Sequence, residues 1–203
     1  MFKRATVLAA LALFALAARP ALAQQVMVDL NPFGGIYFPI SDLVEEDGET
    51  GKQKLGPLFG ARVTVWLNES FGVEGGFAYS ITDAEADIAG TTFEEDANVM
   101  LATLMGLYQF APSPTAPFML HVGAGPALII HGGDAYEDVE GTTDIGGSII
   151  FGGTYDVSDM LAIRFNAQDF MYSAKFGEEP EETDAKFQND LVFTGGVVIK
   201  VGR

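Results

Sequence analysis

Eight segments of this chain alternate bulky apolar residues with small or polar residues at every second position. Successive side chains of a β-strand point to opposite faces, so a period of two predicts strands rather than helices. The predicted strands are Val26–Pro39, Leu55–Leu67, Phe71–Thr82, Asn98–Phe110, Pro117–Ile130, Thr143–Tyr155, Met160–Tyr172 and Gln188–Gly202. The sequence therefore predicts an all-β protein.

The two faces of these strands differ in a way that favours lipid as their surroundings. In the third predicted strand, one face carries Phe71, Val73, Phe77, Tyr79 and Ile81, and the other carries Gly72, Glu74, Gly76, Ala78 and Ser80. A soluble barrel buries its bulky residues, whereas here the small and polar set fits a narrow interior and the bulky set fits a lipid-facing wall. Each predicted strand also reaches the roughly 9–11 residues that a tilted transmembrane strand needs.

An even number of antiparallel strands can close into a ring without leaving an edge. The predicted fold is therefore an eight-stranded antiparallel up-and-down transmembrane β-barrel. The sequence does not decide which face of the fourth strand points inward, because both faces are apolar: Leu101, Met105 and Leu107 oppose Met100, Leu104 and Tyr108. Pro32, Pro57 and Pro126 fall within predicted strands, where each removes a ladder donor and is expected to mark a bulge.

The first 23 residues predict a cleaved secretory signal peptide. Lys3 and Arg4 precede an apolar run, and Ala21-Leu22-Ala23 supplies a small-residue cleavage site. No later stretch approaches the roughly 18 apolar residues of a transmembrane helix. The predicted domains are thus a signal peptide at 1–23 and a barrel at 24–203, exported to the cell outer membrane.

Charge is distributed unevenly along the chain, whose formal net charge is −17. Cleavage after Ala23 would leave 8 basic and 28 acidic residues, a net charge of −20. Four long predicted loops hold 20 of those acids: Ile40–Lys54, Asp83–Ala97, His131–Thr142 and Ser173–Phe187. Every second connection of an up-and-down barrel emerges at the same end, so the acidic loops should share one end. Barrels of this kind place their long loops outside the cell.

Composition excludes several functions. Phosphate binding needs a basic surface, so a sequence isoelectric point near 4.2 argues against nucleic acid as a partner. The chain has no cysteine, which removes disulfides, thiolate catalysis and cysteine-ligated zinc. No nucleophile elbow, phosphate loop or histidine-based metal motif is present, so no cofactor is expected.

The sequence resembles the small eight-stranded outer-membrane β-barrels of diderm bacteria, of the OmpA-barrel-like and OmpX-like class. The resemblance rests on Gly34-Gly35-Ile36-Tyr37, His121-Val122-Gly123-Ala124-Gly125, Arg164-Phe165-Asn166-Ala167-Gln168-Asp169 and Gly195-Gly196-Val197-Val198-Ile199-Lys200-Val201. It implies a monomer in contact with outer-membrane lipids and with the outer-membrane assembly machinery during insertion. Such barrels usually end in an aromatic residue, whereas this chain ends in Arg203.

Charged residues on the predicted inner face are the candidate functional group. They are Arg62, Glu74, Arg164 and Lys200, with His121 beside them and with Asp29 and Asp190 as further candidates. A hairpin around Glu69 brings Arg62 and Glu74 within reach of each other. Unpaired charge in a narrow interior is costly, so these residues should pair and form a salt-bridge plug. The interior of an eight-stranded barrel is filled by side chains, which excludes a wide pore beside this plug. Trp66 shares this inward phase.

These observations predict a non-enzymatic barrel with acidic extracellular loops and a structural, adhesive or surface-protecting role. The alternatives are a lipocalin-like barrel with aromatic residues lining a ligand cavity, a narrow small-solute channel, and a lipid-modifying enzyme with a polar cluster around His131. The loop acids form runs such as Glu45-Glu46-Asp47 and Glu94-Glu95-Asp96, and they could bind divalent cations weakly. None has the spacing of a committed calcium loop.

Overall fold

The computed structural model describes residues 27–41, 44–46, 49–88, 91–113, 116–137, 142–174 and 186–202. The strands are β1 (Met27–Pro39), β2 (Val44–Glu46), β3 (Glu49–Gln53), β4 (Gly56–Trp66), β5 (Phe71–Ile88), β6 (Thr91–Phe110), β7 (Phe118–Gly132), β8 (Thr143–Asp156), β9 (Leu161–Ala174) and β10 (Lys186–Val201). One turn of 3-10 helix, η1 (Asp134–Tyr136), follows β7. No helix within the described ranges is long and apolar enough to cross a membrane. The predicted signal peptide, Met1–Ala23, lies outside them.

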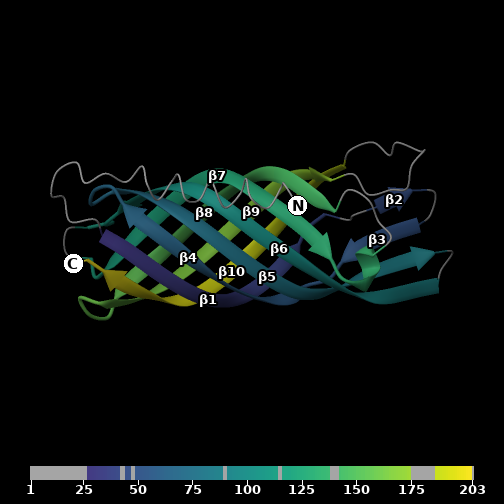
Figure 1. Ribbon diagram of the computed structural model, residues 1–203, viewed down its shortest axis with the longest axis horizontal. Coiled ribbons are helices and arrows are strands. Elements are labelled where there is room, and N and C mark those ends of the chain that lie inside the picture. Colours follow the sequence, from purple (N-terminus) through teal and green to yellow (C-terminus); the bar gives the residue numbers. More distant parts are fainter. Residues whose placement is uncertain are drawn as a thin grey trace, which may run out of the picture.

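Eight of the strands close into a ring (Figure 1). β1 and β4 to β10 pair antiparallel in chain order, and the pairing of β10 with β1 joins the two ends of the sheet. β2 and β3 form a short hairpin that pairs, through β3, with the outer part of β5. The predicted eight-stranded up-and-down barrel is therefore confirmed. We call the end where residues 67–70, 111–113, 116–117 and 157–160 lie the short-turn end.

The opposite end holds β2, β3, the outer parts of β5 and β6, and η1, and we call it the acidic end. Two stretches expected to be loops there contain strands. Residues 40–54 include β2 and β3, and β5 and β6 stay paired from Phe71–Tyr108 to Ile88–Thr91. The predicted loop Asp83–Ala97 is therefore wrong in its structure, although its acids do lie at this end.

A neighbouring lysine contacts two acids of that hairpin. The register places Glu85 directly opposite Glu94, and like charges in such a pair repel. Lys54 Nζ lies 3.0 Å from Glu85 Oε2 and 2.9 Å from Glu94 Oε2. Its charge offsets part of this repulsion, in a ladder that also places Asp83 opposite Asp96.

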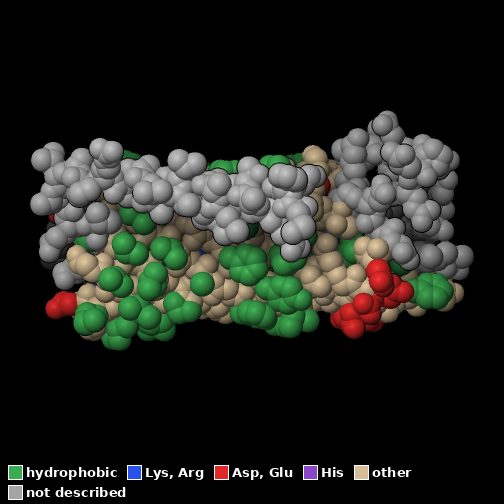
Figure 2. Space-filling model, in the orientation of Figure 1, with side chains coloured by type: hydrophobic (Ala, Val, Ile, Leu, Met, Phe, Trp, Pro, Cys, Tyr) green, Lys and Arg blue, Asp and Glu red, His purple; other side chains and the backbone are tan. Residues whose placement is uncertain are grey.

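The barrel wall is apolar on the outside. Burial alternates along β4, where Phe59 is 52% exposed and Arg62 only 4%. Figure 2 shows apolar side chains over the strands, with a group of Asp and Glu side chains toward the end of the barrel where β5 ends and β6 begins. A soluble lipocalin-like barrel would expose polar side chains on its outer wall, so this apolar wall argues against that alternative.

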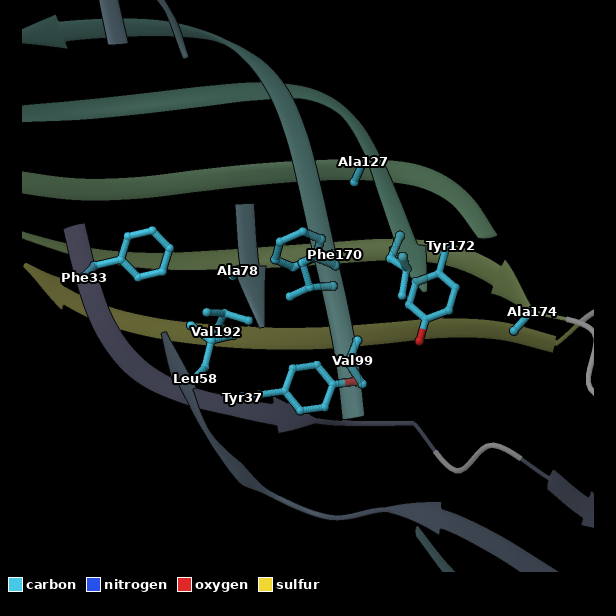
Figure 3. Close-up of a cluster of buried hydrophobic side chains, with 12 residues drawn as sticks. Phe33, Tyr37, Leu58, Ala78, Val99, Ala127, Phe170, Tyr172, Ala174 and Val192 are labelled. Carbon is cyan, nitrogen blue, oxygen red and sulfur yellow. The ribbon is translucent and has the colours of Figure 1, made fainter. Parts of the chain in front are cut away.

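The interior contains two apolar clusters. The larger lies toward the acidic end and includes Phe33, Tyr37, Leu58, Val99, Leu101, Ile129, Phe170, Tyr172 and Val192 (Figure 3). The smaller, toward the short-turn end, consists of Trp66, Met105, Leu107 and Ile150. The inward phase predicted for Trp66 is confirmed. Along the inner face of β4, Leu58, Arg62 and Trp66 follow one another, so a charged layer lies between the clusters.

Two details that the sequence left open or misjudged are settled by the ladders. On β6, Leu101, Met105 and Leu107 face inward, and Leu104 is 55% exposed. The predicted bulges are wrong, because each ladder keeps a single register past the prolines. Instead, pairing of β1 with β10 is interrupted at Pro32, and pairing of β6 with β7 is interrupted at Pro126. A proline removes one donor without requiring an extra residue.

Candidate functional site

Three charged side chains meet in the interior between the two apolar clusters. Arg164 on β9 donates from Nη1 to Glu74 Oε2 at 2.6 Å and from Nη2 to Oε1 at 3.3 Å. β5, which carries Glu74, and β9 lie on opposite sides of the eight-stranded ring, so this pair spans the barrel interior. Arg62 on β4 approaches the same carboxylate, with Nε 3.7 Å from Oε1. Each of the three side chains is at most 4% exposed.

The β4–β5 hairpin fixes two members of this group. Its register pairs Thr64 with Glu74 and Arg62 with Gly76, so Arg62 is the diagonal neighbour of Glu74 on the inner face. Diagonal neighbours in a ladder are within reach of long side chains. Thr64 Oγ1 adds a hydrogen bond of 2.6 Å to Glu74 Oε2. The carboxylate is thus held by its own hairpin as well as by the opposite wall.

The Arg62 guanidinium is engaged on several sides. Its Nη2 donates to Gln168 Oε1 at 3.1 Å, and its Nη1 donates to Thr194 Oγ1 at 3.3 Å. Its carbon lies 3.8 Å from the centre of the Phe33 ring, within the range of a cation–π interaction. A buried charge is tolerated when it is paired and hydrogen-bonded, and these contacts meet that condition.

His121 joins the group through an amide. Its Nε2 lies 2.7 Å from Asn166 Oδ1, which also accepts a hydrogen bond of 3.0 Å from Arg164 Nε. Asn166 Nδ2 donates to Thr194 Oγ1 at 3.2 Å, which closes a circuit back to Arg62. Four of the five residues selected from the sequence therefore belong to one hydrogen-bonded network.

Lys200, the fifth, makes its ion pair elsewhere. Its Nζ contacts Asp156 Oδ1 near the short-turn end. There a cavity of about 340 Å³ is lined by Met27, Asp29, Trp66, Glu69, Leu107, Gln109, Met119, His121, Thr154, Asp156, Arg164, Val198 and Lys200. We call this cavity the vestibule. Asp29 accepts a hydrogen bond of 2.7 Å from Trp66 Nε1 on its wall.

Asp190 lies in the other half of the barrel, inside the larger apolar cluster. Tyr172 Oη donates to Asp190 Oδ2 at 2.8 Å and lies 3.2 Å from His131 Nε2. The His131 ring also packs 5.4 Å from the ring of Tyr136. Polar groups therefore do surround His131, and its side chain is buried, with 2% of its surface exposed.

Sequence reasoning missed the uncharged members of the network. Thr64 and Thr194 were on predicted inner faces but carry no charge to attract notice. Asn166 and Gln168 follow Arg164 at successive second positions, so extending the alternation from Arg164 would have placed both inside. Gln168 also donates to Ser148 Oγ at 3.0 Å, which links the network to β8.

The polar groups of this network are engaged with one another. Its acid is held by two guanidinium groups and a hydroxyl, and its hydroxyl and amide groups bond to one another. Among the described residues, no group of three or more His, Asp or Glu side chains could hold a metal ion. The expected weak cation binding by acidic runs falls largely on side chains outside the described set and stays a prediction.

Comparison with known proteins places this geometry in a family. A family model for the outer membrane protein beta-barrel domain matches residues 6–198. The comparison with curated protein sequences found no match.

Solved structures of outer-membrane barrels are similar to this chain. OprG of Pseudomonas aeruginosa is 12% identical with a TM-score of 0.65, covering 88% of this chain and 97% of OprG. Outer Membrane Protein W of E. coli is 16% identical with a TM-score of 0.55, covering 88% and 99%. Ail of Yersinia pestis, solved with the heparin analogue sucrose octasulfate, is 12% identical with a TM-score of 0.50, covering 87% and 99%. At these identities, the likeness shows the fold.

Proposed function

Because the chain belongs to the outer membrane protein beta-barrel family, we propose that it is a non-enzymatic outer-membrane protein with a closed lumen and an outward-facing acidic end. Its role is structural, adhesive or surface-protecting. The observation that carries the proposal is Glu74 bound between Arg164 and Arg62 across the interior. An ion-paired layer between two apolar clusters supports a closed lumen, because solutes would have to displace these contacts to pass.

Conductance of the purified protein in planar bilayers tests the closed lumen. We expect no large steady current from the wild-type protein or from a Glu85→Gln variant, which alters only the acidic end. A wide porin in the same bilayer serves as the positive control. A large, steady conductance from the wild-type protein would support the narrow-channel alternative and end the closed-lumen proposal.

The orientation rests on the asymmetry of the two ends. Three connections are short, whereas the acidic end carries the long β5–β6 hairpin, β2, β3 and η1. Family barrels place short turns in the periplasm and longer connections outside. The chain has no cysteine, so single substitutions can be labelled cleanly. A membrane-impermeant maleimide on intact cells should label Asp134→Cys and leave Ser158→Cys unlabelled; the reverse pattern would invert the orientation.

The charge of the acidic end restricts an adhesive role to basic partners. A heparin-like polyanion, such as the analogue bound to Ail, would be repelled by Glu94, Glu95 and Asp134. Binding of cells to a polylysine surface should therefore fall with rising salt, and binding to heparin should be absent. Proteolysis with and without millimolar Ca²⁺ tests weak cation binding at the acidic end. Slower cleavage in Ca²⁺ would support it, and an unchanged rate would refute it.

Lipid contact is supported by a shallow outer groove of about 540 Å³. Its lining includes the small residues Gly35, Gly153 and Ala167 and the aromatic residues Phe151 and Phe165. An acyl chain fits such an apolar depression. Insertion by the outer-membrane assembly machinery and a monomeric state complete the proposal. Depleting that machinery should leave the protein unfolded, and light scattering in detergent should give the mass of one chain.

Export through the N-terminal segment is the remaining part of the proposal. Cleavage after Ala23 makes Gln24 the first residue of the mature protein. Mass spectrometry of protein purified from membranes should find that terminus. Recovery of an intact Met1 would instead indicate an uncleaved segment.

A further inference from the structure

The vestibule contains a carboxylate whose hydrogen bonding is incomplete. Asp29 lines the cavity and is 9% exposed. Its Oδ2 accepts the indole hydrogen of Trp66, but its Oδ1 is buried without a hydrogen-bond partner. An unpaired buried carboxylate oxygen is unfavourable, because it has lost water and gained no donor. The position therefore favours a donor supplied from outside the chain.

The two cations in the lining of the vestibule are already paired. Lys200 is its direct partner in the β1–β10 ladder, yet the Lys200 ammonium bonds to Asp156. Arg164, at the inner end of the vestibule, bonds to Glu74. Neither cation of the lining therefore compensates the negative charge of the Asp29 carboxylate. Within the part of the chain that the structure describes, no ion pair neutralises it.

The remaining lining determines which donor fits. Met27, Trp66, Leu107, Met119 and Val198 give the vestibule apolar walls. A metal ion is a poor match, because no group of three ligating side chains exists among the described residues. A guanidinium group prefers two free carboxylate oxygens, and Asp29 has one. An ammonium group on a short aliphatic chain matches the single acceptor and the apolar walls.

We propose that the vestibule is a binding site for a small aliphatic primary ammonium ion, held by Asp29 and packed against Trp66. The ammonium group donates to the free Asp29 oxygen, and the hydrocarbon part replaces water along the apolar wall. The closed lumen proposed above would make the site a closed end rather than a passage. The site is independent of the proposed adhesive role and of the orientation in the membrane.

The chain carries its own reporter for this site, because Trp66 is its only tryptophan. The protein is folded in detergent micelles and titrated with n-butylammonium chloride at constant ionic strength. We expect a saturable change in Trp66 fluorescence, and 1-butanol, which has the same size and no charge, should produce none. An equal response to 1-butanol would overturn the proposal.

Asp29→Asn tests the carboxylate, since the amide keeps an acceptor for the indole and removes the charge. Its affinity for butylammonium should fall at least about tenfold. Glu85→Gln, which removes one charge at the acidic end, is the matched control and should bind as wild type does. Unchanged binding by a folded Asp29→Asn protein would refute the site.

A second measurement needs no variant. A single tryptophan gives one indole N–H resonance, and this hydrogen is the one donated to Asp29. That resonance should shift with butylammonium and stay fixed with 1-butanol. If Asp29→Asn fails to fold, this comparison in the wild-type protein decides the question, and an unmoved resonance contradicts the proposal.

Discussion

Glu74 and Arg164 connect opposite walls of the barrel through two hydrogen bonds, 2.6 and 3.3 Å long. Neither strand contacts the other through its backbone, so the side chains alone make this link. Arg62 also approaches the Glu74 carboxylate. The charged layer between the two apolar clusters therefore contains two cations, Arg62 and Arg164, and one anion, Glu74. Loss of the Glu74 carboxylate should therefore destabilise the barrel more than loss of either arginine.

Glu74→Ala should lower the free energy of unfolding by about 3–5 kcal/mol, because it leaves two buried guanidinium groups without a counter-ion. Urea unfolding in lipid vesicles, followed by heat-modifiable migration on gels, measures the loss. Glu85→Gln at the exposed acidic end provides the comparison. Equal stability of the two variants would mean that the charged layer contributes nothing to the fold.

The two arginines should differ in importance. Arg62→Met leaves the bidentate Glu74–Arg164 pair intact and removes repulsion between like charges, so its cost should be small. Arg164→Met leaves Glu74 with the more distant Arg62, at 3.7 Å, and should cost at least about 1–2 kcal/mol more. The same unfolding assay ranks them. A larger loss for Arg62→Met would show that its contacts with Phe33 and Gln168 dominate.

Two glycines test how tightly the wall is packed. A Cβ at Gly125 on β7 would overlap the Leu104 carbonyl oxygen and lie 2.8 Å from the Met105 Cα. Gly125→Ala should therefore destabilise the barrel by about 1–3 kcal/mol. A Cβ at Gly75 on β5 meets nothing within 4 Å, so Gly75→Ala should change stability by no more than about 0.5 kcal/mol. Similar losses at both positions would argue against this packing.

Lys54 should hold the acidic hairpin together. Hydrogen bonds to Glu94 and Glu85 raise the pKa of Lys54, so its contribution is present at neutral pH and is lost as pH rises through that raised pKa. Lys54→Gln should speed amide exchange at the β5–β6 tip roughly two- to fivefold, because exposed ion pairs are weak. High salt should produce the same change in the wild-type protein. If neither Lys54→Gln nor high salt changed the rate of amide exchange at the tip, Lys54 would not have this role.

A charge on the outer wall tests the lipid-facing assignment. Val63 on β4 is 45% exposed and points away from the interior. Val63→Arg should destabilise the protein in vesicles by about 2–4 kcal/mol if this position lies near the bilayer midplane. Val63→Leu preserves the apolar surface and should be nearly neutral. No penalty for the arginine would mean that Val63 faces water.

The sequence by itself determined the elements and, for most of them, the faces. Period-two alternation is a local property, so the inward phase of Arg62, Glu74 and Trp66 was readable without knowing any partner. The pairing of Arg62 with Glu74 was also readable, because a short turn around Glu69 fixes the register of one hairpin. Segregation of the acids along the chain likewise predicted an acidic end.

Only the tertiary structure decided what meets across the ring. Which residue of β9 faces Glu74 depends on how far all eight strands are staggered when the sheet closes, and no local pattern records that stagger. The inner face of β6 needed the same information, because apolar residues occupy both of its faces and only packing against neighbours separates Met105 from Leu104. Contact of the extended β5–β6 hairpin with Lys54, from a different connection, was likewise visible only in the folded chain. Local periodicity fixes which way a side chain points, whereas barrel closure fixes what it touches.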